Sequence, residues 1–416
     1  MDEQVDVVVV GAGVIGLCSA LALLEAGRSV RVLEASTIGS GSSHGNCGTL
    51  TPSHAAPLAA PGTIARAMRW MLTPDAPFYV APRLDPGLWR WMLGFARRCN
   101  LRDWRSALVP RAAILNDSIQ TYAAWVARHA PDAEYAEEGV DYVFRTAREF
   151  DIAARDIPHL AAVGIPAEVI AGADYERQDP AFRPGIHATL RFPGDARLRP
   201  DRYVAGMARS LLALGGGIEE GWEVQGVDED ADGVVVYGSR GRIRAREVVF
   251  ATGAWSPTLM RSAGLGALPV QPGKGYSITY DRPALAPRRP VVLHEPSVCV
   301  TVWDSGYRLG STMEFSGYST SLNRRRLDAL ERGAATFLHE PVGPVKHEEW
   351  YGWRPLSIDD VPIIGRVPGR RHAWVATGHG MMGVSMSPST GQLVADLICG
   401  RETRIDPAPY SPERFR

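Results

Sequence analysis

The sequence lacks a long hydrophobic run, an excess of positive charge and a signal-peptide pattern, and each absence excludes a class of protein. No stretch of about 18 consecutive apolar residues occurs, so no membrane span is predicted. The 45 basic and 46 acidic residues leave a net charge of −1, which argues against a nucleic-acid partner. Because the N-terminus has no basic segment before its first apolar run, we expect a cytoplasmic protein.

Cysteines are few and scattered along the chain. The five are Cys18, Cys47, Cys99, Cys299 and Cys399, with no Cys-x-x-Cys pair and no Cys/His cluster at metal-ligand spacing. This pattern predicts neither a disulfide framework nor a metal site, and reduced thiols fit a cytoplasmic protein. No internal repeat divides the 416 residues, and their 45% hydrophobic and 22% charged content is typical of globular proteins.

The first segment with a clear pattern is a strand, a glycine-rich turn, a helix and a second strand. Val5–Val10 is valine-rich, which is typical of a strand buried on both faces. Leu17–Ala26 has a helical pattern that ends at a glycine, and Val30–Leu33 is a second buried strand. A unit of this kind predicts the start of a doubly wound α/β domain.

Three glycines follow the first strand at the spacing G-x-G-x-x-G. Gly11 permits the tight turn, Gly13 lets the backbone approach a pyrophosphate, and Gly16 lets the helix pack closely on the strand. The helix N-terminus offers N–H groups and a positive dipole to the phosphates. Glu34 closes the second strand, where its carboxylate can accept hydrogen bonds from ribose hydroxyls. The segment predicts a dinucleotide site without choosing between NAD and FAD.

Two later segments favour FAD. At 248–255, "VVFATGAW" ends a buried strand with Thr252 and Gly253, where the chain can pass close to a pyrophosphate or ribose. At 378–398, "GHGMMGVSMSPSTGQLVADLI" places glycines at the start of a long apolar helix. An NAD-dependent dehydrogenase that used the first motif alone is the alternative from another class, and it leaves both segments unexplained.

The middle of the chain has a different pattern. Ser106–His129 reads as a long helix, and residues 270–350 alternate as in an antiparallel sheet, with one helix near Leu322–Leu338. This order predicts a dinucleotide domain assembled from separated segments, with a second sheet inserted between them.

Taken together, six segments resemble the amine-oxidising flavoproteins of the D-amino-acid oxidase and glycine oxidase family, and within it the bacterial D-amino-acid dehydrogenases. They are "VVVVGAGVIG" (7–16), "GNCGTLTPSHAAPLAAPG" (45–62), "VFRT" (143–146), "KGYSIT" (274–279), "WRPLSIDDVPIIG" (353–365) and "GHGMMGVSMSPSTGQLVADLI" (378–398). They occur in order over almost the whole chain.

The resemblance implies FAD in a doubly wound domain, beside a substrate domain with a mixed, largely antiparallel sheet. We expect the FAD domain at 1–62, 197–265 and 351–416, and the substrate domain at 63–196 and 266–350. The cofactor-binding residues predicted from the motifs and the resemblance are Gly11, Gly13, Val14, Ile15, Gly16, Glu34, Ala35, Ser42, Ser43, Gly48, Val224, Thr252, Gly253, Gly380, Met381, Met382 and Gly383.

The resemblance also implies substrate-binding residues. Arg354 is expected to grip a substrate carboxylate, because a planar guanidinium can form two charge-assisted hydrogen bonds with it. Tyr276 resembles a tyrosine that supports the carboxylate, although a buried structural role fits it equally well. His379 stands at the flavin end of the last helix, where its neighbours' N–H groups are the competing candidates. His54 either faces the substrate or caps a turn.

His44 and Cys47 raise the question of a covalent flavin, because some relatives attach FAD through a histidine or a cysteine. His44 falls about one residue out of register with the covalent-histidine pattern of those relatives. We therefore expect a non-covalent FAD.

The expected reaction is hydride transfer from the substrate Cα to flavin N5, which gives an imino acid that water hydrolyses to a 2-oxo acid and ammonia. The last helix would stabilise reduced flavin through its N-terminal dipole. A D-amino acid is the expected substrate, and a cyclic secondary amino acid such as a proline or hydroxyproline isomer is the alternative. A non-catalytic FAD-binding scaffold is a third hypothesis. A quinone, another acceptor or O₂ takes up the electrons.

A segment rich in tryptophan and arginine has two interpretations. Amphipathic helices of this kind can rest on an anionic membrane surface such as the inner face of the cell membrane, where a quinone is found, or they can form a lid or wall of the active site. The apolar residues are Trp70, Met71, Trp89, Trp91, Met92 and Phe95, and the arginines are Arg66, Arg69, Arg90, Arg97 and Arg98.

Overall fold

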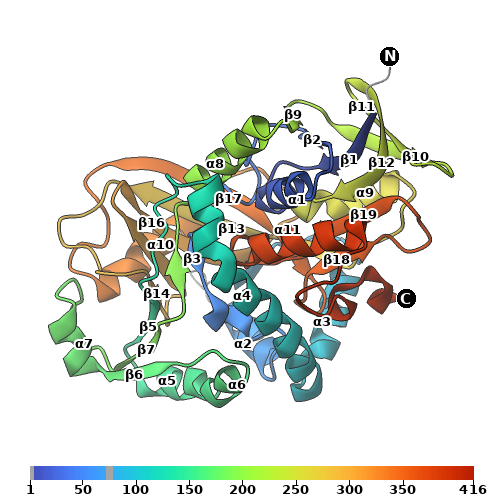
Figure 1. The fold of residues 1–416 in the computed structure, drawn as a ribbon. Helices are drawn as coiled ribbons and strands as arrows, with labels where there is room; N and C mark the ends of the chain where they lie inside the picture. The colour runs from blue at the N-terminus through green and yellow to red at the C-terminus, as the bar shows by residue number, and fades with distance from the viewer. Residues whose placement is uncertain (1–3, 72–77) are drawn as a thin grey trace.

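The computed structural model describes residues 4–71 and 78–416, which form two large sheets with helices packed against them (Figure 1). The predicted α/β class, with a mixed and largely antiparallel second sheet, is confirmed. A short third sheet joins β3 (Thr49–Leu50) to β8 (Ala196–Arg197).

The first sheet collects strands from three separate parts of the chain, as predicted. Its order is β10-β11-β12-β1-β2-β9, with β19 beside β12 and β18 beside β19. The strands β1, β2, β9, β12 and β19 run parallel to one another. The bounds are β1 (Gln4–Val10), β2 (Val30–Leu33), β9 (Gly217–Glu219), β10 (Val224–Glu229), β11 (Val234–Gly238), β12 (Gly241–Phe250), β18 (Ile363–Arg366) and β19 (Ala373–Thr377).

The central strand β1 is buried on both faces, as its valines predict. Val7 and Val9 pack into the core formed with the helices, whereas Val8 and Val10 pack into the core on the other face of the sheet. The helix that follows, α1 (Val14–Glu25), begins three residues earlier than the hydrophobic pattern indicates. Its first turn includes glycine-rich sequence that carries little helical signal of its own.

Helices α1, α4 (Leu101–His129), α8 (Pro200–Ala213) and α11 (Gly383–Cys399) pack together on one side of the first sheet (Figure 1). The closest approach is between α1 and α11, where a Cβ on Gly391 would lie 2.5 Å from the carbonyl oxygen of Cys18. A glycine at this position lets the two helices approach closely and holds the N-terminus of α11 in place beside the glycine turn.

The second sheet has the order β17-β13-β16-β15-β14-β5-β7-β6, with β4 beside β16. Its pairs are antiparallel except β5 with β14 and β4 with β16. Helix α10 (Arg324–Phe337) covers one face of this sheet through a core of its own. The strands are β4 (Phe78–Val80), β5 (Val140–Phe144), β6 (Glu168–Ala171), β7 (Ala188–Phe192), β13 (Val270–Tyr280), β14 (Val291–Leu293), β15 (Val298–Trp303), β16 (Gly306–Phe315) and β17 (Lys346–Ser357).

Two elements make contacts across the predicted domain boundaries. Strand β17 runs through residue 351 because it pairs with β13 along its whole length, so the second sheet ends after Ser357. Helix α4, which the predicted substrate segment includes, packs mainly on α11. The remaining short helices are α2 (Thr63–Met71), α3 (Pro86–Arg98), α5 (Ala147–Ala154), α6 (Ile157–Ala162), α7 (Gly172–Gln178) and α9 (Ser256–Ser262). The division into an FAD domain and a substrate domain stays a prediction.

Candidate active site

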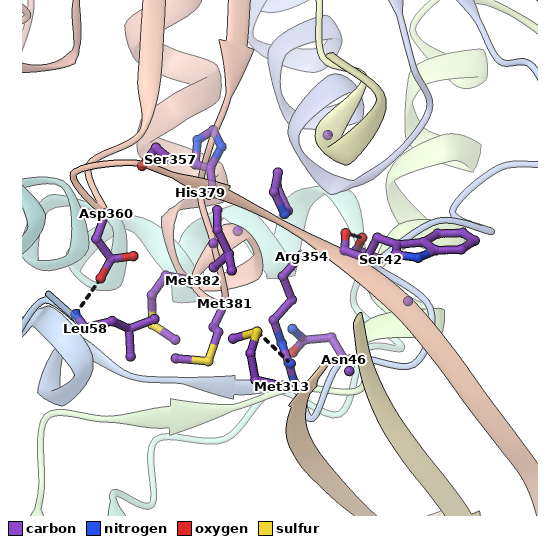
Figure 2. A pocket seen from close by; sticks show the side chains of 18 of the residues that line it. Ser42, Asn46, Leu58, Met313, Arg354, Ser357, Asp360, His379, Met381 and Met382 are labelled. Carbon is purple, nitrogen blue, oxygen red and sulfur yellow. Dashed lines mark hydrogen bonds between the residues drawn. The ribbon is translucent and has the colours of Figure 1, made fainter. Parts of the chain in front are cut away.

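A cavity of about 1690 Å³ lies between the glycine turn of the first sheet and one face of the second sheet. Part of it is seen in Figure 2. The predicted residues that line it are Gly11, Gly13, Val14, Ile15, Glu34, Ala35, Ser42, Ser43, His54, Val224, Thr252, Gly253, Tyr276, Arg354, His379, Gly380, Met381, Met382 and Gly383. Sequence segments more than 300 residues apart therefore meet at one cavity.

Two of the three motif glycines are required by the fold itself. Gly11 has φ +105°, and a Cβ on it would lie 2.7 Å from the carbonyl oxygen of Ala251. A Cβ on Gly16 would lie 1.9 Å from the carbonyl oxygen of Gly11. Any larger residue at either position would push α1 or β12 away from the turn.

Gly13 differs from its two neighbours in the motif. Its φ of −76° and ψ of 178° suit any residue, and the one atom within 4 Å of an added Cβ is Ser43 Oγ, at 3.4 Å. The same hydroxyl accepts a hydrogen bond from the Val14 N–H at 3.0 Å and so caps α1. The fold leaves space in front of Gly13 at the positive end of a helix, which fits a pyrophosphate.

Glu34 lies at the end of β2, where it was predicted. Its two carboxylate oxygens accept hydrogen bonds from the Ala12 N–H at 2.8 Å and from the Ser36 N–H at 2.9 Å. The side chain therefore also ties the glycine turn to the second strand. A ribose hydroxyl would use the lone pairs that these two bonds leave free.

The second predicted cofactor segment borders the same cavity. Gly253 has φ +52°, and no atom lies within 4 Å of an added Cβ, so the chain leaves open space beside it. Thr252 and Val224 line the cavity as well. Gly48 is not among the residues that line it. A Cβ there would lie 2.1 Å from the Leu198 carbonyl oxygen, so chain packing favours a glycine, and the predicted cofactor role stays a prediction.

The N-terminus of α11 points into the cavity, but not all of the predicted N–H donors are free. The Gly380 N–H binds the Pro355 carbonyl at 2.9 Å, and the Met382 N–H binds the His379 carbonyl at 2.9 Å. Met381 and Gly383 are the remaining members of the predicted set and line the cavity. The N–H groups of Met381 and Gly383 are therefore the candidates to bind a cofactor group at this helix N-terminus.

His379 is fixed in the interior rather than directed at the substrate residues. Its Nε2 lies 3.0 Å from Thr390 Oγ1 on α11, and its ring points away from the Arg354 guanidinium (Figure 2). Burial lowers the pKa of His379 to about 3, so the ring is neutral at pH 7. Its predicted catalytic role stays a prediction. Because the ring is neutral at pH 7, His379 cannot donate a proton as an imidazolium at that pH.

Arg354 lies on β17 with its guanidinium over Gly275 of β13. A Cβ on Gly275 would lie 2.4 Å from Arg354 Cζ, so the glycine provides the space for the guanidinium. Nη1 donates to the Thr312 carbonyl, and the sulfur of Met313 lies 3.9 Å from Nη1. Figure 2 shows the side chain extending toward Asn46 and Met313.

The backbone that receives Arg354 is strained. Ser311 and Thr312 have φ of 142° and 63°, and the register of β16 against β13 shifts between Lys274 and Tyr276. Such a bulge re-aims backbone groups, and here it turns the Thr312 carbonyl toward the guanidinium. The strain is placed where it orients a charged side chain at the cavity.

The charge of Arg354 has no carboxylate partner in the part of the chain that the structure describes. Burial lowers the pKa of its guanidinium, and the neighbouring groups that oppose this shift are the thiols of Cys47 and Cys299. An arginine remains protonated at pH 7 even so. A half-buried cation without a carboxylate partner creates a site for an anionic ligand at the cavity, and a carboxylate matches its geometry.

Tyr276 faces away from this charge. Its hydroxyl donates to Glu314 Oε2 at 3.2 Å, and its ring packs in the core beneath α10. Successive residues of a strand point to opposite faces, so Gly275 rather than Tyr276 presents the cavity face. These contacts favour the buried structural role, and the support of the substrate carboxylate by Tyr276, which also borders the cavity, stays a prediction.

His54 belongs to a buried hydrogen-bonded chain that the sequence does not reveal. Its Nδ1 lies 2.6 Å from Tyr142 Oη, which lies 2.8 Å from Ser53 Oγ. Ser53 Oγ donates to Asp195 Oδ2 at 2.5 Å. Burial lowers the pKa of His54 to about 4 and raises that of Asp195 to about 8. His54 therefore faces the cavity as a neutral ring, which fits a hydrogen-bonding role toward substrate.

A buried ion pair positions the same segment. Arg111 on α4 binds Asp360 Oδ2 through Nη1 at 3.1 Å and donates through Nη2 to the His54 carbonyl at 2.8 Å. Asp360 Oδ2 also accepts the Leu58 N–H at 2.9 Å (Figure 2). Asp360 stands in the segment "WRPLSIDDVPIIG", where sequence analysis drew attention to Arg354 alone.

The two candidates for covalent flavin attachment differ in position. His44 Nε2 lies 2.9 Å from Glu348 Oε1, and His44 is not among the residues that line the cavity. Cys47 does line it, beside Cys299. The position of His44 supports a non-covalent cofactor, as the register of the sequence predicts.

The tryptophan-rich helices α2 and α3 form part of the cavity wall. Trp91 is buried, stacks on Phe95 at 5.2 Å and packs against Phe315 of β16. Trp70, Trp89 and Met92 line the cavity too, which supports the wall interpretation. The side chain of Met71 lies outside the described residues. Across 4–71 and 78–416, no helix has the length and apolar character needed to span a membrane.

Comparison with known proteins gives the family. The model of the DAO family, described as FAD dependent oxidoreductase, matches residues 6–397. This chain belongs to that family. D-amino acid dehydrogenases of Granulibacter bethesdensis and Cereibacter sphaeroides are 31% and 32% identical to it, over 98% of this chain and 99% and 95% of theirs.

Solved structures agree on the fold. Glycine oxidase from Geobacillus kaustophilus superposes with a TM-score of 0.79 at 24% identity, over 98% of both chains. L-proline dehydrogenase from P. horikoshii gives a TM-score of 0.74 at 19% identity, over 100% of this chain and 98% of that one. The cofactor of this DAO-family protein is FAD, and the space at Gly13, the open side of Gly253 and the helix N-termini fit it.

Proposed function

We propose that this protein oxidises the carbon–nitrogen bond of an amino acid, and that Arg354 binds the substrate carboxylate. The main support is the half-buried Arg354 guanidinium, which faces the cavity of the dinucleotide turn and has no carboxylate partner among the described residues. A D-amino acid is the proposed substrate, because relatives named D-amino acid dehydrogenase are similar over nearly the full length of the chain.

FAD, held without a covalent bond by the residues around Gly13, Gly253 and the α11 N-terminus, supplies the hydride acceptor when bound. The residues of the chain orient the substrate. Arg354 fixes the carboxylate and therefore the direction of the Cα–H bond. The neutral rings of His54 and His379 add no positive charge that would repel the substrate amino group. Aromatic and apolar side chains of α2 and α3 form part of the cavity wall beside the substrate residues.

The test is anaerobic bleaching of the bound flavin by a panel of D-amino acids, L-amino acids, prolines and hydroxyprolines. We expect at least one D-amino acid to bleach the flavin faster than its enantiomer and to yield a 2-oxo acid and ammonia. Bleaching by cyclic secondary amino acids alone would favour the alternative substrate class. If dithionite reduces the flavin but no amino acid does, the protein is a scaffold and the proposal is wrong.

We further propose a quinone as the electron acceptor, reached from a membrane surface that α2 and α3 contact. Leu84, just before α3, is 103% exposed and does not line the cavity, whereas Met68, Trp89 and Leu93, which are 65%, 53% and 55% exposed, also line it. They stand among the arginines predicted from the sequence, and basic amphipathic helices of this kind bind anionic lipid.

Co-sedimentation with anionic and zwitterionic vesicles tests this contact. We expect binding to anionic vesicles that salt weakens, because arginines near the surface add roughly 1 kcal/mol each. The double variant Leu84→Asp, Leu93→Asp should lose most of the binding. The double variant Leu212→Asp, Leu214→Asp is the control, since these leucines are similarly exposed at 54% and 52% near the end of α8. Equal binding to both vesicle types would contradict the proposal.

A further inference from the structure

Two cysteines from distant parts of the chain meet in the wall of the cavity. Cys299 lies on β15, where it pairs in register with Gly310 of β16. The sulfur of Cys47 lies 2.4 Å from the position that a Cβ on Gly310 would occupy. Because Cβ positions of directly paired residues are about 4.5–5.5 Å apart, the glycine at 310 leaves the space through which the Cys47 thiol reaches Cys299.

Both thiols line the cavity and border the space at Gly310. Neither takes part in a disulfide. Cys18 is buried inside α1, and Cys99 and Cys399 do not line the cavity. Cys47 and Cys299 are therefore neighbours in the cavity wall. Cys99 and Cys399, which lie elsewhere, can serve as controls.

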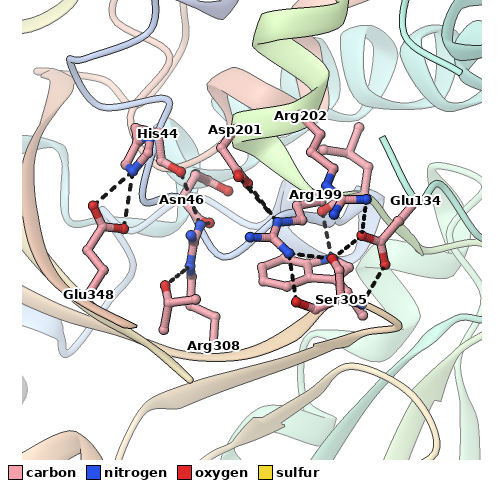
Figure 3. Close-up of polar contacts among 12 residues, drawn as sticks. His44, Asn46, Glu134, Arg199, Asp201, Arg202, Ser305, Arg308 and Glu348 are labelled. Carbon is pink, nitrogen blue, oxygen red and sulfur yellow. Dashed lines mark hydrogen bonds and ion pairs between the residues drawn. The ribbon is translucent and has the colours of Figure 1, made fainter. Parts of the chain in front are cut away.

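The loop that carries Cys47 is held in place by a buried arginine. Arg308 of β16 donates through Nη1 to the carbonyls of His44 at 3.1 Å and Asn46 at 2.7 Å, and through Nε to Thr279 Oγ1 at 2.9 Å (Figure 3). The ion pair between the His44 side chain and Glu348 holds the same part of the loop (Figure 3). The backbone on the N-terminal side of Cys47 is thus tied to the second sheet.

The surroundings shift the pKa values of the two thiols in opposite directions. The neighbouring Cys299 and the guanidiniums of Arg354 and Arg308 lower the pKa of the Cys47 thiol, against the opposing effect of burial. The neighbouring Cys47, followed by burial, raises the pKa of Cys299. A thiol near two cations and a proton donor is the one that reacts as a thiolate.

We propose that Cys47 and Cys299 form a peroxide-reactive dithiol in the substrate cavity, which closes reversibly to a disulfide. The Cys47 thiolate attacks one oxygen of hydrogen peroxide, giving a sulfenic acid, and the other oxygen leaves as water after taking up a proton. The Cys299 sulfur then attacks the Cys47 sulfur, its proton leaves with the hydroxyl group as a second water, and the S–S bond forms. The dithiol loses two electrons and the peroxide gains them.

Closure acts on Arg354, and this part of the inference rests on the proposed function. The Arg354 side chain extends toward Asn46, the residue before Cys47 (Figure 2), and it shares the cavity wall with both thiols, which oppose the effect of burial on the pKa of its guanidinium. A disulfide removes their ionisable protons and draws the 44–48 loop toward β15. We expect the carboxylate site to be disturbed and amino acid turnover to fall.

The experiment treats the FAD-loaded protein with a small excess of hydrogen peroxide, blocks remaining thiols with N-ethylmaleimide and maps the peptides without reduction. We expect a cross-linked peptide that contains Cys47 and Cys299, the loss of two of the five thiols, and full recovery by dithiothreitol. Turnover, relative to each protein before treatment, should fall at least about tenfold, which is equivalent to about 1.4 kcal/mol of transition-state stabilisation.

Variants separate this site from general oxidation. Cys47→Ser and Cys299→Ser should give no cross-link, and Gly310→Ala should also block it, because the added Cβ occupies the place of the Cys47 sulfur. Cys99→Ser and Cys399→Ser are matched controls and should cross-link like wild type. The flavin spectrum and thermal stability report whether each variant is folded.

If N-ethylmaleimide alkylates both Cys47 and Cys299 after peroxide treatment, the proposal of a dithiol site is wrong. If the cross-link forms but turnover does not fall, the proposed effect on Arg354 is wrong. The peptide map needs no amino acid oxidation, so its outcome is independent of the proposed function.

Discussion

Replacing Arg354 by lysine or methionine is expected to lower kcat/KM for the best amino acid substrate by about 30-fold to several-thousand-fold. The range follows from losing a buried charge-assisted pair, which costs roughly 2–5 kcal/mol, at about 1.36 kcal/mol for each tenfold change. Lysine keeps the charge but cannot reproduce a two-pronged grip on a carboxylate. It would also lose the bond that holds Nη1 to the Thr312 carbonyl.

The decisive measurement compares the amino acid with the amine that lacks its carboxylate. Wild type should reduce its flavin much faster with the amino acid, and both variants should lose this advantage. The flavin spectrum should change little, because Arg354 lies on β17 of the second sheet and not at the glycine turn. If the advantage of the amino acid survives with the flavin still bound, another residue holds the carboxylate.

Arg324→Lys is the matched control. Arg324 on α10 forms an ion pair with Glu349, which belongs to the same strand as Arg354, but it does not line the cavity. Exposed ion pairs contribute roughly 0–1 kcal/mol, so this variant should keep wild-type kinetics. A similar loss in both arginine variants would indicate a general weakening of β17 and not a specific carboxylate site.

The elements that could be predicted from the sequence are those whose signal is local. The valines of β1 and the glycines that follow it specify a buried strand and a tight turn through their own conformational preferences. The glycines before α11 and its apolar length likewise locate the last helix. The position of Arg354 at the cavity also follows the prediction, which depended on a family resemblance and not on periodicity, and its role toward the substrate stays a proposal.

The features that sequence analysis missed depend on register between strands. Whether Gly275 or Tyr276 faces the cavity is decided by the pairing of β13, and a one-residue shift exchanges the two faces. The bulge at Thr312 and the pairing of Cys299 with Gly310 are of the same kind. No spacing in the sequence places Cys47 beside Cys299, because they are more than 250 residues apart.

Buried polar pairs are the second kind of feature that the sequence does not reveal. Ser53 forms hydrogen bonds with both Asp195 and Tyr142, which come from separate parts of the chain. Arg111 on α4 forms an ion pair with Asp360. Each group is acceptable in the interior because its partner is present, and partners brought together by the fold leave no local pattern. These contacts place His54 and the 55–58 segment beside the cavity.

Replacing Gly13 by valine is expected to yield a folded protein without FAD. The backbone at Gly13 suits any residue, and Ser43 Oγ is the one atom within 4 Å of an added Cβ. The fold therefore does not require a glycine here, whereas the approach of a pyrophosphate to the backbone does. The two methyl groups of valine would occupy that approach, and stoichiometric FAD should fall to a trace in the purified protein.

The comparison that decides this prediction uses graded and control variants. Gly13→Ala should retain part of the FAD, because its single methyl group makes an ordinary contact with Ser43. Gly194→Val, at an exposed glycine with no atom within 4 Å of an added Cβ, should retain all of it. Bound FAD is measured by absorbance after acid precipitation, which releases a non-covalent flavin into solution, and folding by circular dichroism.

Stoichiometric FAD in a folded Gly13→Val protein would show that the pyrophosphate does not lie at this turn. Loss of the helical signal would show that glycine is needed by the fold after all, as it is at Gly11 and Gly16, where an added Cβ meets a carbonyl oxygen at 2.7 Å and 1.9 Å.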